Sequence, residues 1–156
     1  MIPTYLERIE ESGYTYASRL EELVKVSDIL TLHTPLTSEN YHMVNREILA
    51  TAKDGVIIVS TARGELIDIE ALIEYVKLGK VRAVALDVVE GEPISSEHPL
   101  LKYGNVIVTP HIAAHTEEGV RGMDEAVVEA IINFLEDKPI DGVVVSPKNP
   151  RRVRPS

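Results

Sequence analysis

Short apolar runs alternate with segments of helical periodicity along most of this 156-residue chain. The run at 55–61 is β-branched and does not alternate between apolar and polar residues, which is typical of a strand buried on both faces of a parallel sheet. Strands are also expected at 28–33, 81–86 and 106–109. Parallel strands need long crossover connections, which helices usually supply. The sequence therefore predicts an α/β fold, with a partial doubly wound parallel sheet and flanking helices.

The expected helices lie before, between and after these strands. Their ranges are 20–26, 45–50, 69–78 and a long helix that runs to about residue 135. Asp68 is expected to cap the helix at 69–78, which ends at Gly79. Thr116 can cap the long helix. The long helix is expected to be amphipathic, because these apolar residues fall at helical spacing: Val120, Met123, Val127, Ile131 and Phe134.

Composition argues against several classes of function. Apolar residues make up 44% of the chain and charged residues 26%, as in ordinary soluble globular proteins. No apolar run approaches the roughly 18 residues that a membrane span needs, and no apolar segment near the N-terminus resembles a signal peptide. The net charge of -9 argues against a nucleic-acid partner. The absence of cysteine excludes disulfides and fits the expectation of a cytoplasmic protein.

Polar residues follow the expected strands at the point where each strand ends. These exits are Thr34-Pro35, Thr61 to Arg63, Asp87 to Glu92 and Thr109 to His111. In open parallel sheets, ligands bind beyond the carboxyl ends of the strands. We therefore expect the four segments to converge on one crevice.

Arg63 follows the strand at 55–61 and has two interpretations. Its guanidinium can hold a substrate carboxylate through two parallel hydrogen bonds. Alternatively, it is a surface arginine paired with Glu65 or Asp68, which are close in sequence. Gly64, directly after it, is expected to let the backbone turn tightly.

His111 also has two interpretations. Its ring can satisfy a backbone carbonyl at a helix end, or it can act as a general acid that protonates a ketone oxygen as hydride arrives at the carbon. A carboxylate against the second ring nitrogen would fix the tautomer of such a histidine. Glu92 is a candidate for this carboxylate, and Glu90 and Glu97 compete with it. By default, the loop that holds these glutamates is a polar turn.

Other polar residues are given structural roles or keep two interpretations. The histidines treated as structural are His33, His42, His98 and His115. His111 and His115 have a spacing that would suit a metal on a helix, but no third ligand is apparent, so no metal is expected. Asp87 can bond a cofactor amide or cap the following turn, and Asn40 can equally be a plain turn residue.

Six segments, taken in order, closely resemble the D-isomer-specific 2-hydroxyacid dehydrogenase family. In sequence letters they are LEELVKVSDILTLHTPLT, NREILA, TARGELID, ALDVVEGEP, HPL and TPHIAA. Each segment alone is weak evidence for the family, but the ordered set is strong evidence. The likeness extends from about Leu20 to about Pro150. The resemblance implies a Rossmann-like NAD-binding domain and the reduction of a 2-ketoacid to a D-2-hydroxyacid by hydride transfer.

The resemblance also implies a role for each site residue. Arg63 would bind the substrate carboxylate, His111 would be the acid–base residue, and Glu92 would pair with His111. On the adenosine and phosphate side of NAD, the matching residues are Thr34, Pro35 and Asn40. At the nicotinamide end they are Thr61, Ala62, Asp87, His111 and Ala114, and Arg63 is also counted among the cofactor-binding residues. NADP in place of NAD stays open.

Three segments are expected from this resemblance. Residues 1–19 would be the remnant of a first mononucleotide-binding half, with a last short strand at 14–16. Residues 20–137 would be the second half, which carries the catalytic residues, and residues 138–156 would return toward a substrate domain. The sequence holds no Gly-x-Gly-x-x-Gly turn for a pyrophosphate, so weak or no NAD affinity is expected for the chain alone.

An incomplete sheet would leave the strand at 28–33 with an open edge, and such edges recruit other chains. We expect the edge to be covered by self-association into a homo-oligomer, by exchanged segments or by a separate N-terminal chain. Three functions stay open: a truncated NAD-dependent oxidoreductase that is inactive alone, a non-catalytic dinucleotide-binding or dimerisation module, and a vestigial fragment. The expected substrate is a small 2-ketoacid or 2-hydroxyacid of unspecified identity.

Overall fold

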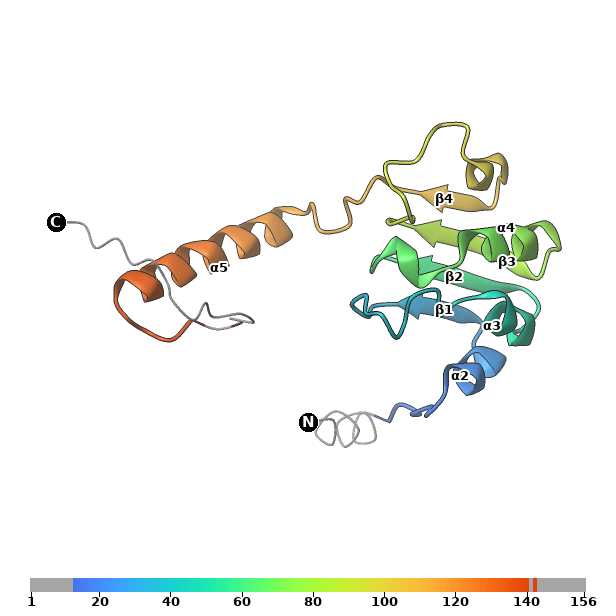
Figure 1. The fold of residues 1–156 in the computed structure, drawn as a ribbon, viewed down its shortest axis with the longest axis horizontal. Coiled ribbons are helices and arrows are strands. Elements are labelled where there is room, and N and C mark those ends of the chain that lie inside the picture. Colours follow the sequence, from blue (N-terminus) through green and yellow to red (C-terminus); the bar gives the residue numbers. More distant parts are fainter. Residues whose placement is uncertain (1–12, 141, 143–156) are drawn as a thin grey trace. The chain divides into compact units, whose positions relative to one another are not determined.

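The computed structural model describes residues 13–140 and residue 142. The chain divides into two units, Met1–Ala113 and Ala114–Ser156, and the first contains the sheet (Figure 1). The elements of the first unit, in chain order, are α2 (Leu20–Val26), β1 (Ile29–Leu32), α3 (Arg46–Thr51), β2 (Val56–Ser60), the 3₁₀ helix η1 (Gly64–Leu66), α4 (Ile69–Lys77), β3 (Val81–Leu86), the 3₁₀ helix η2 (Pro99–Lys102) and β4 (Val106–Val108). The second unit contains α5 (Glu117–Leu135).

The four strands form one parallel sheet in the order β1-β2-β3-β4, which confirms the predicted α/β fold class. Figure 1 shows all four arrows pointing the same way. The register pairs Leu30 with Ile58, and Ile58 with Val84. An α-helix or a 3₁₀ helix lies in each connection between neighbouring strands, so all four strands end at the same edge of the sheet.

The core of the first unit lies on one face of this sheet. The strand residues Leu32, Ile58 and Leu86 are at most 4% exposed. They belong to the same cluster of buried side chains as Leu49 of α3 and Leu72 of α4. Burial of each such side chain stabilises the fold by about 2 kcal/mol. The helices that join the strands are therefore held to the sheet mainly by apolar packing.

The other face of the sheet is less buried. In β2, buried residues alternate with half-buried ones. On the less buried face, Ile29 of β1 is 59% exposed and Ile107 of β4 is 65% exposed. The prediction that the strand at 55–61 is buried on both faces is therefore wrong for the described unit. The reason is that its helices contribute their buried side chains to the cluster on one face.

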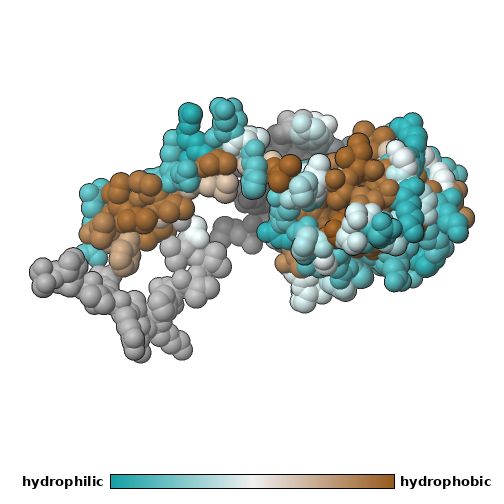
Figure 2. All heavy atoms as spheres, turned by 90° about the horizontal axis from the view of Figure 1, so that it is seen from above, coloured by the Kyte–Doolittle hydropathy of each residue, from teal (hydrophilic) through white to brown (hydrophobic). Residues whose placement is uncertain are grey.

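Side-chain caps set the boundaries of the two longest helices. Asp68 Oδ1 accepts a hydrogen bond from the Ala71 N–H at 3.1 Å at the start of α4, as predicted, and Gly79 with φ of 75° follows its end. Thr116 Oγ1 accepts from the Gly119 N–H at 3.0 Å at the start of α5. The apolar residues of α5 are exposed, and Figure 2 shows them as a brown patch along this helix. In the part of the chain that the structure describes, no helix combines the length and apolar character needed to cross a membrane.

Residues 14–16 do not form the short strand predicted for them. Tyr14 is 74% exposed and Tyr16 is 52% exposed, and no described strand pairs with this segment. A single extended segment gains no ladder hydrogen bonds and is therefore not stable as a strand. Residues 1–12 of the predicted segment at 1–19 lie outside the described residues, as does most of 138–156.

Candidate active site at the carboxyl edge of the sheet

A shallow hollow of about 440 Å³ lies at the carboxyl ends of β1 and β2. Its lining residues are His33, Thr34, Pro35, Leu36, Thr61, Ala62 and Arg63. The structure therefore brings together the residues of two strand exits that were predicted to bind a cofactor. His33 was predicted to be structural; it lines this hollow, and its Nε2 lies 2.8 Å from the Thr31 hydroxyl.

Asn40 closes the loop that supplies Thr34 and Pro35. Its Oδ1 accepts from the Thr37 N–H at 2.7 Å, and its Nδ2 donates to the Pro35 carbonyl at 2.8 Å. Both contacts are local, so the geometry matches the interpretation of Asn40 as a turn residue. Asn40 fixes the shape of one wall of the hollow, and direct contact with a cofactor stays a prediction.

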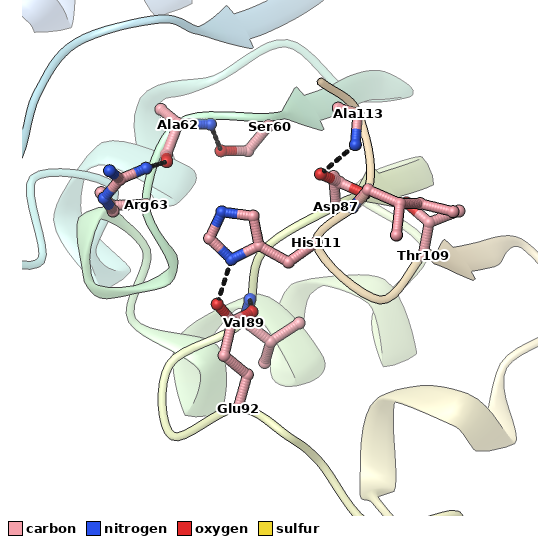
Figure 3. A network of polar contacts seen from close by, with 10 residues as sticks. Ser60, Ala62, Arg63, Asp87, Val89, Glu92, Thr109, His111 and Ala113 are labelled. Carbon is pink, nitrogen blue, oxygen red and sulfur yellow. Dashed lines mark hydrogen bonds and ion pairs between the residues drawn. The ribbon is translucent and has the colours of Figure 1, made fainter. Parts of the chain in front are cut away.

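Glu92 and His111 come from different strand exits and form a close pair. Glu92 Oε1 lies 2.5 Å from His111 Nδ1, and Glu92 Oε2 accepts from the Val89 N–H at 3.2 Å. Figure 3 shows the two side chains directed toward one another, with the second ring nitrogen of His111 facing away from Glu92. The competing candidate Glu90 contacts His42 instead. The His111 side chain is 51% exposed, so its ring is accessible from solvent.

A buried carboxylate fixes the turn that carries His111. Asp87 is 5% exposed, and its Oδ1 accepts from the Thr109 hydroxyl at 2.5 Å and from the Ile112 N–H at 2.9 Å. Its Oδ2 accepts from the Ala113 N–H at 2.8 Å, and its backbone carbonyl accepts from the His111 N–H at 2.9 Å. These bonds hold His111 in the left-handed region with φ of 55°, which is unfavourable for a residue with a Cβ atom.

The same contacts determine the ionisation of Asp87. Burial raises the pKa of its carboxyl group, but hydrogen bonds from one hydroxyl and two backbone N–H groups outweigh burial and lower the pKa below its ordinary value. The charged form of Asp87 is therefore favoured in the folded chain. This geometry matches the turn-cap interpretation of Asp87, and a contact between Asp87 and a cofactor amide stays a prediction.

Arg63 follows β2 with an extended backbone and an exposed side chain. Its Nη1 donates to the Ala62 carbonyl at 2.7 Å. Among the described residues, neither Glu65 nor Asp68 forms an ion pair with Arg63, so the interpretation as a surface ion pair is not supported. Because a guanidinium carries five N–H donors, the side chain retains donors for a planar carboxylate.

Gly64 is needed for a reason other than the predicted tight turn. Its φ lies outside the left-handed region, so any residue could adopt its backbone conformation. A Cβ atom at this position would lie 2.2 Å from the Glu90 N atom and 2.2 Å from the Val89 C atom. The segment after β2 therefore packs directly on the peptide bond between Val89 and Glu90, and only glycine leaves room for this contact.

Two hydroxyl groups that shape the site have no role predicted from the sequence. Thr109 donates to Asp87, and Ser60, which is fully buried, accepts from the Ala62 N–H at 3.5 Å. Both residues are polar positions at the ends of apolar strands, and this is the signal that could have identified them. Ala114 belongs to the second unit, so its predicted contact with a cofactor stays a prediction.

These features together define a class of protein. The carboxyl edge of a parallel α/β sheet presents a hollow between two strand exits, a guanidinium, and a histidine paired with a carboxylate. In open α/β sheets this edge is where nucleotides bind. A histidine held by a carboxylate is suited to transfer protons. The class is that of Rossmann-like dinucleotide-binding domains.

Comparison with known proteins identifies the family within this class. The family described as "D-isomer specific 2-hydroxyacid dehydrogenase, NAD binding domain" matches residues 3–113. A D-3-phosphoglycerate dehydrogenase from Archaeoglobus fulgidus is 41% identical over 141 residues, which cover 90% of this chain and 27% of that protein. A hydroxypyruvate reductase from Thermotoga maritima is 51% identical over 118 residues, which cover 74% of this chain and 39% of that protein.

Solved structures agree with this match. The crystal structure of D-lactate dehydrogenase from Aquifex aeolicus complexed with NAD and lactic acid has a TM-score of 0.75 and 35% identity, and the match covers 84% of this chain and 44% of that chain. The chain therefore belongs to the D-isomer specific 2-hydroxyacid dehydrogenase family. It spans less than half the length of these relatives.

Gly64→Ala is expected to destabilise the chain by about 1–3 kcal/mol, because the new methyl group forces two backbone segments apart. The matched control is Gly104→Ala, since a Cβ atom there meets nothing within 4 Å. Urea unfolding of both variants measures the difference in free energy. Equal unfolding midpoints for the two variants would contradict the close contact between Gly64 and the peptide bond of Val89 and Glu90.

Asp87→Asn is expected to lower stability near neutral pH by about 2 kcal/mol, because an amide cannot accept from all three donors. The folded pKa of Asp87 lies below the ordinary value of 3.8, so its stabilising effect is present above that pH and is lost as pH falls through the folded pKa. The stability difference from wild type should therefore shrink in acid. Denaturant unfolding at a series of pH values measures this difference.

The control for this pH series is Asp54→Asn, which removes a carboxylate whose side chain is 90% exposed. Its stability should stay close to that of wild type throughout the series, since exposed ion pairs contribute little. A difference between wild type and Asp87→Asn that is the same at every pH would show that the charge of Asp87 is not what holds the turn.

Proposed function

We propose that this chain is the part of an NAD-dependent D-2-hydroxyacid dehydrogenase that carries the catalytic residues Arg63, Glu92 and His111. The reaction is the reversible reduction of a 2-ketoacid to a D-2-hydroxyacid by hydride transfer. The observation that supports this most is the contact of 2.5 Å between Glu92 and His111 at the carboxyl edge of the sheet. A histidine held by a carboxylate in this way is suited to donate a proton to a ketone oxygen.

The residues at the strand exits fit a dinucleotide. The hollow beyond β1 and β2 offers the hydroxyl groups of Thr34 and Thr61 beside the apolar surfaces of Pro35 and Ala62. NADH, when bound, supplies the hydride. We assign Thr34, Pro35, Thr61 and Ala62 to the wall against which the cofactor lies, with Asn40 holding the loop at 35–40 in shape.

His111 supplies the proton that the reaction needs. As hydride reaches the carbonyl carbon, the ring nitrogen that faces away from Glu92 donates its proton to the carbonyl oxygen, so the ketone gains one hydride and one proton. Glu92 accepts from Nδ1, which fixes the proton donor at Nε2 and stabilises the charged ring. Arg63 holds the substrate carboxylate through paired hydrogen bonds and keeps the carbonyl beside the ring.

Relatives with this sequence pattern are named for different 2-ketoacids, among them hydroxypyruvate and glyoxylate. A small 2-ketoacid is therefore the proposed substrate class. These relatives are longer than the match, which covers 34–39% of their length. We propose that the remaining groups around cofactor and substrate come from residues with no counterpart in this chain, and that the chain is inactive without them.

A hybrid enzyme tests the proposed roles. The matched region of the Thermotoga maritima hydroxypyruvate reductase is replaced by the corresponding residues of this chain, and NADH-dependent reduction of hydroxypyruvate is measured. His111→Gln should lower kcat by about 10²- to 10⁴-fold, because the proton donor is lost. Glu92→Gln should narrow the acidic-to-neutral pH range of reduction, because the imidazolium loses its counter-charge. Arg63→Gln should chiefly raise KM.

The control in this hybrid is His98→Gln, which keeps an acceptor for the Leu100 N–H and should leave turnover unchanged. A hybrid in which His111→Gln turns over like its parent would refute the assignment of the proton donor. An unchanged pH–rate profile in Glu92→Gln would remove Glu92 from the mechanism.

We also propose that the open edge of β1 is covered by self-association, by exchanged segments or by a separate N-terminal chain. Among the described residues β1 pairs with β2 alone. Asp28 turns its carbonyl to the Ile57 N–H, so the backbone groups of Ile29 and Thr31 point to the open edge. Unpaired groups of this kind form ladders with other strands.

Light scattering on the eluting chain measures this association. We expect an oligomer for the chain alone, and Ile29→Lys should shift it toward monomer without unfolding it, because Ile29 is 59% exposed and a charge at an edge blocks strand pairing. A stable monomer at every concentration and with no partner would refute the proposal that the edge of β1 is covered. An oligomer that is unaffected by Ile29→Lys would place the interface elsewhere.

A further inference from the structure

Three side chains outside the proposed catalytic set form a polar cluster. The Tyr41 hydroxyl donates to Glu90 Oε1 at 2.8 Å, and His42 Nε2 lies 2.7 Å from Glu90 Oε2. The rings of Tyr41 and His42 stack with centroids 3.9 Å apart and an interplanar angle of 17°. Both oxygens of one carboxylate are therefore held by neighbouring residues of a loop far away in the sequence.

The loop that supplies this cluster also holds the segment of Arg63. The His42 N–H donates to the Glu65 carbonyl at 2.8 Å, and the Val44 N–H donates to the Leu66 carbonyl at 3.0 Å. His42 has φ of 50°, which lies in the left-handed region that few residues with a Cβ atom adopt. Such strain persists only where the surrounding contacts determine the conformation.

On its other side, the cluster holds the segment of Glu92. Glu90 lies two residues before Glu92, and its peptide nitrogen packs directly on Gly64. The Val89 N–H donates to Glu92 Oε2, so the backbone that Glu90 anchors also orients the carboxylate that faces His111. A shift of this backbone would move Glu92 away from His111 Nδ1.

We propose that Tyr41, His42 and Glu90 form a clamp that positions Glu92 against His111 and holds the Arg63 segment in place. Its members are positioning residues, because each contacts the segments that carry the catalytic groups and none contacts His111. The proposal rests on the proposed function in one respect only: the contact between Glu92 and His111 matters because the two residues are proposed to be catalytic.

The geometry distinguishes this clamp from an ordinary surface ion pair. Isolated exposed ion pairs contribute little to stability and do not fix the position of a backbone segment. Here one carboxylate is engaged at both oxygens, and the His42 and Glu90 side chains are 31% and 34% exposed. Hydrogen bonds from His42 and Tyr41 hold the pKa of Glu90 below its ordinary value, so the carboxylate stays charged and the bonds stay strong.

The test measures the bond between Glu92 and His111 in the full chain without turnover. Nuclear magnetic resonance of the imidazole nitrogens reports whether His111 Nδ1 donates to a carboxylate, and Glu92→Gln gives the signal for the lost bond. Glu90→Ala should shift the His111 signal toward that of Glu92→Gln, although Glu90 does not contact His111. Glu90→Gln, which keeps an acceptor, should restore part of the wild-type signal.

The matched control is Glu97→Ala, which removes an exposed carboxylate from the same loop and should leave the His111 signal unchanged. Tyr41→Phe removes only a hydroxyl group and tests the clamp if Glu90→Ala does not fold, with a smaller shift in the same direction expected. A wild-type His111 signal in folded Glu90→Ala or in Tyr41→Phe would overturn the clamp. This experiment measures a bond in the chain without substrate. The clamp can therefore be refuted while the hybrid enzyme supports the proposed function, and the clamp can be supported while the hybrid enzyme refutes that function.

Discussion

The geometry of the site depends on one buried carboxylate. Asp87 ends β3, is 5% exposed, and receives hydrogen bonds from Thr109, Ile112 and Ala113. A charge at this depth is tolerated only when it is fully hydrogen-bonded. Meeting that need forces the chain after β4 into a tight turn, and His111 at its centre takes a left-handed backbone conformation. The position of the His111 imidazole therefore follows from the hydrogen bonds that the buried Asp87 carboxylate requires.

Two further contacts bring the other proposed catalytic groups, Arg63 and Glu92, to the same edge. Gly64 packs on the peptide bond that precedes Glu90, which links the exit of β2 to the exit of β3. Glu92 then accepts from the Val89 N–H with one oxygen and faces His111 with the other. The exits of β2, β3 and β4 thus interlock through backbone groups as well as side chains. A substitution that shifts the backbone at one of these exits would also shift the other two, because packed segments of this kind have few alternative arrangements.

Much of the fold and part of the site could be predicted from the sequence. Strand and helix positions follow from apolar periodicity and caps such as Asp68, which are local properties of the chain. The placement of the polar exits at one edge follows from parallel topology, because every strand ends there. The prediction of one crevice is wrong, since the exits of β1 and β2 line one hollow and those of β3 and β4 line another. The choice between Glu90 and Glu92 as the partner of His111 could not be made from the residue pattern alone, and only the family resemblance favoured Glu92. The choice depends on left-handed backbone at His42 and His111, which residue type alone does not specify.

Two errors have the same physical origin, since each concerns contacts between distant segments. Gly64 is required by the approach of the Val89 and Glu90 backbone and not by its own φ. The strand at 55–61 is apolar on both faces, but the described helices of its unit bury only one of them. The sequence of a strand shows which of its faces are apolar. Which helix covers an apolar face depends on the tertiary structure. Local patterns cannot supply that information.

The exposure of Glu92 and His111, the proposed acid–base pair, bears on how the site would work. Every contact that places Glu92 against His111 lies within the first unit, so the pair is preorganised there. The two side chains are nevertheless 38% and 51% exposed, and water screens charges strongly at such positions. Hydride transfer benefits from a site that excludes water, since the same charges then act more strongly on the reacting carbonyl. In the proposed mechanism, the contact between Glu92 and His111 sets which ring nitrogen donates the proton, and exclusion of water from the pair would strengthen its effect on the carbonyl.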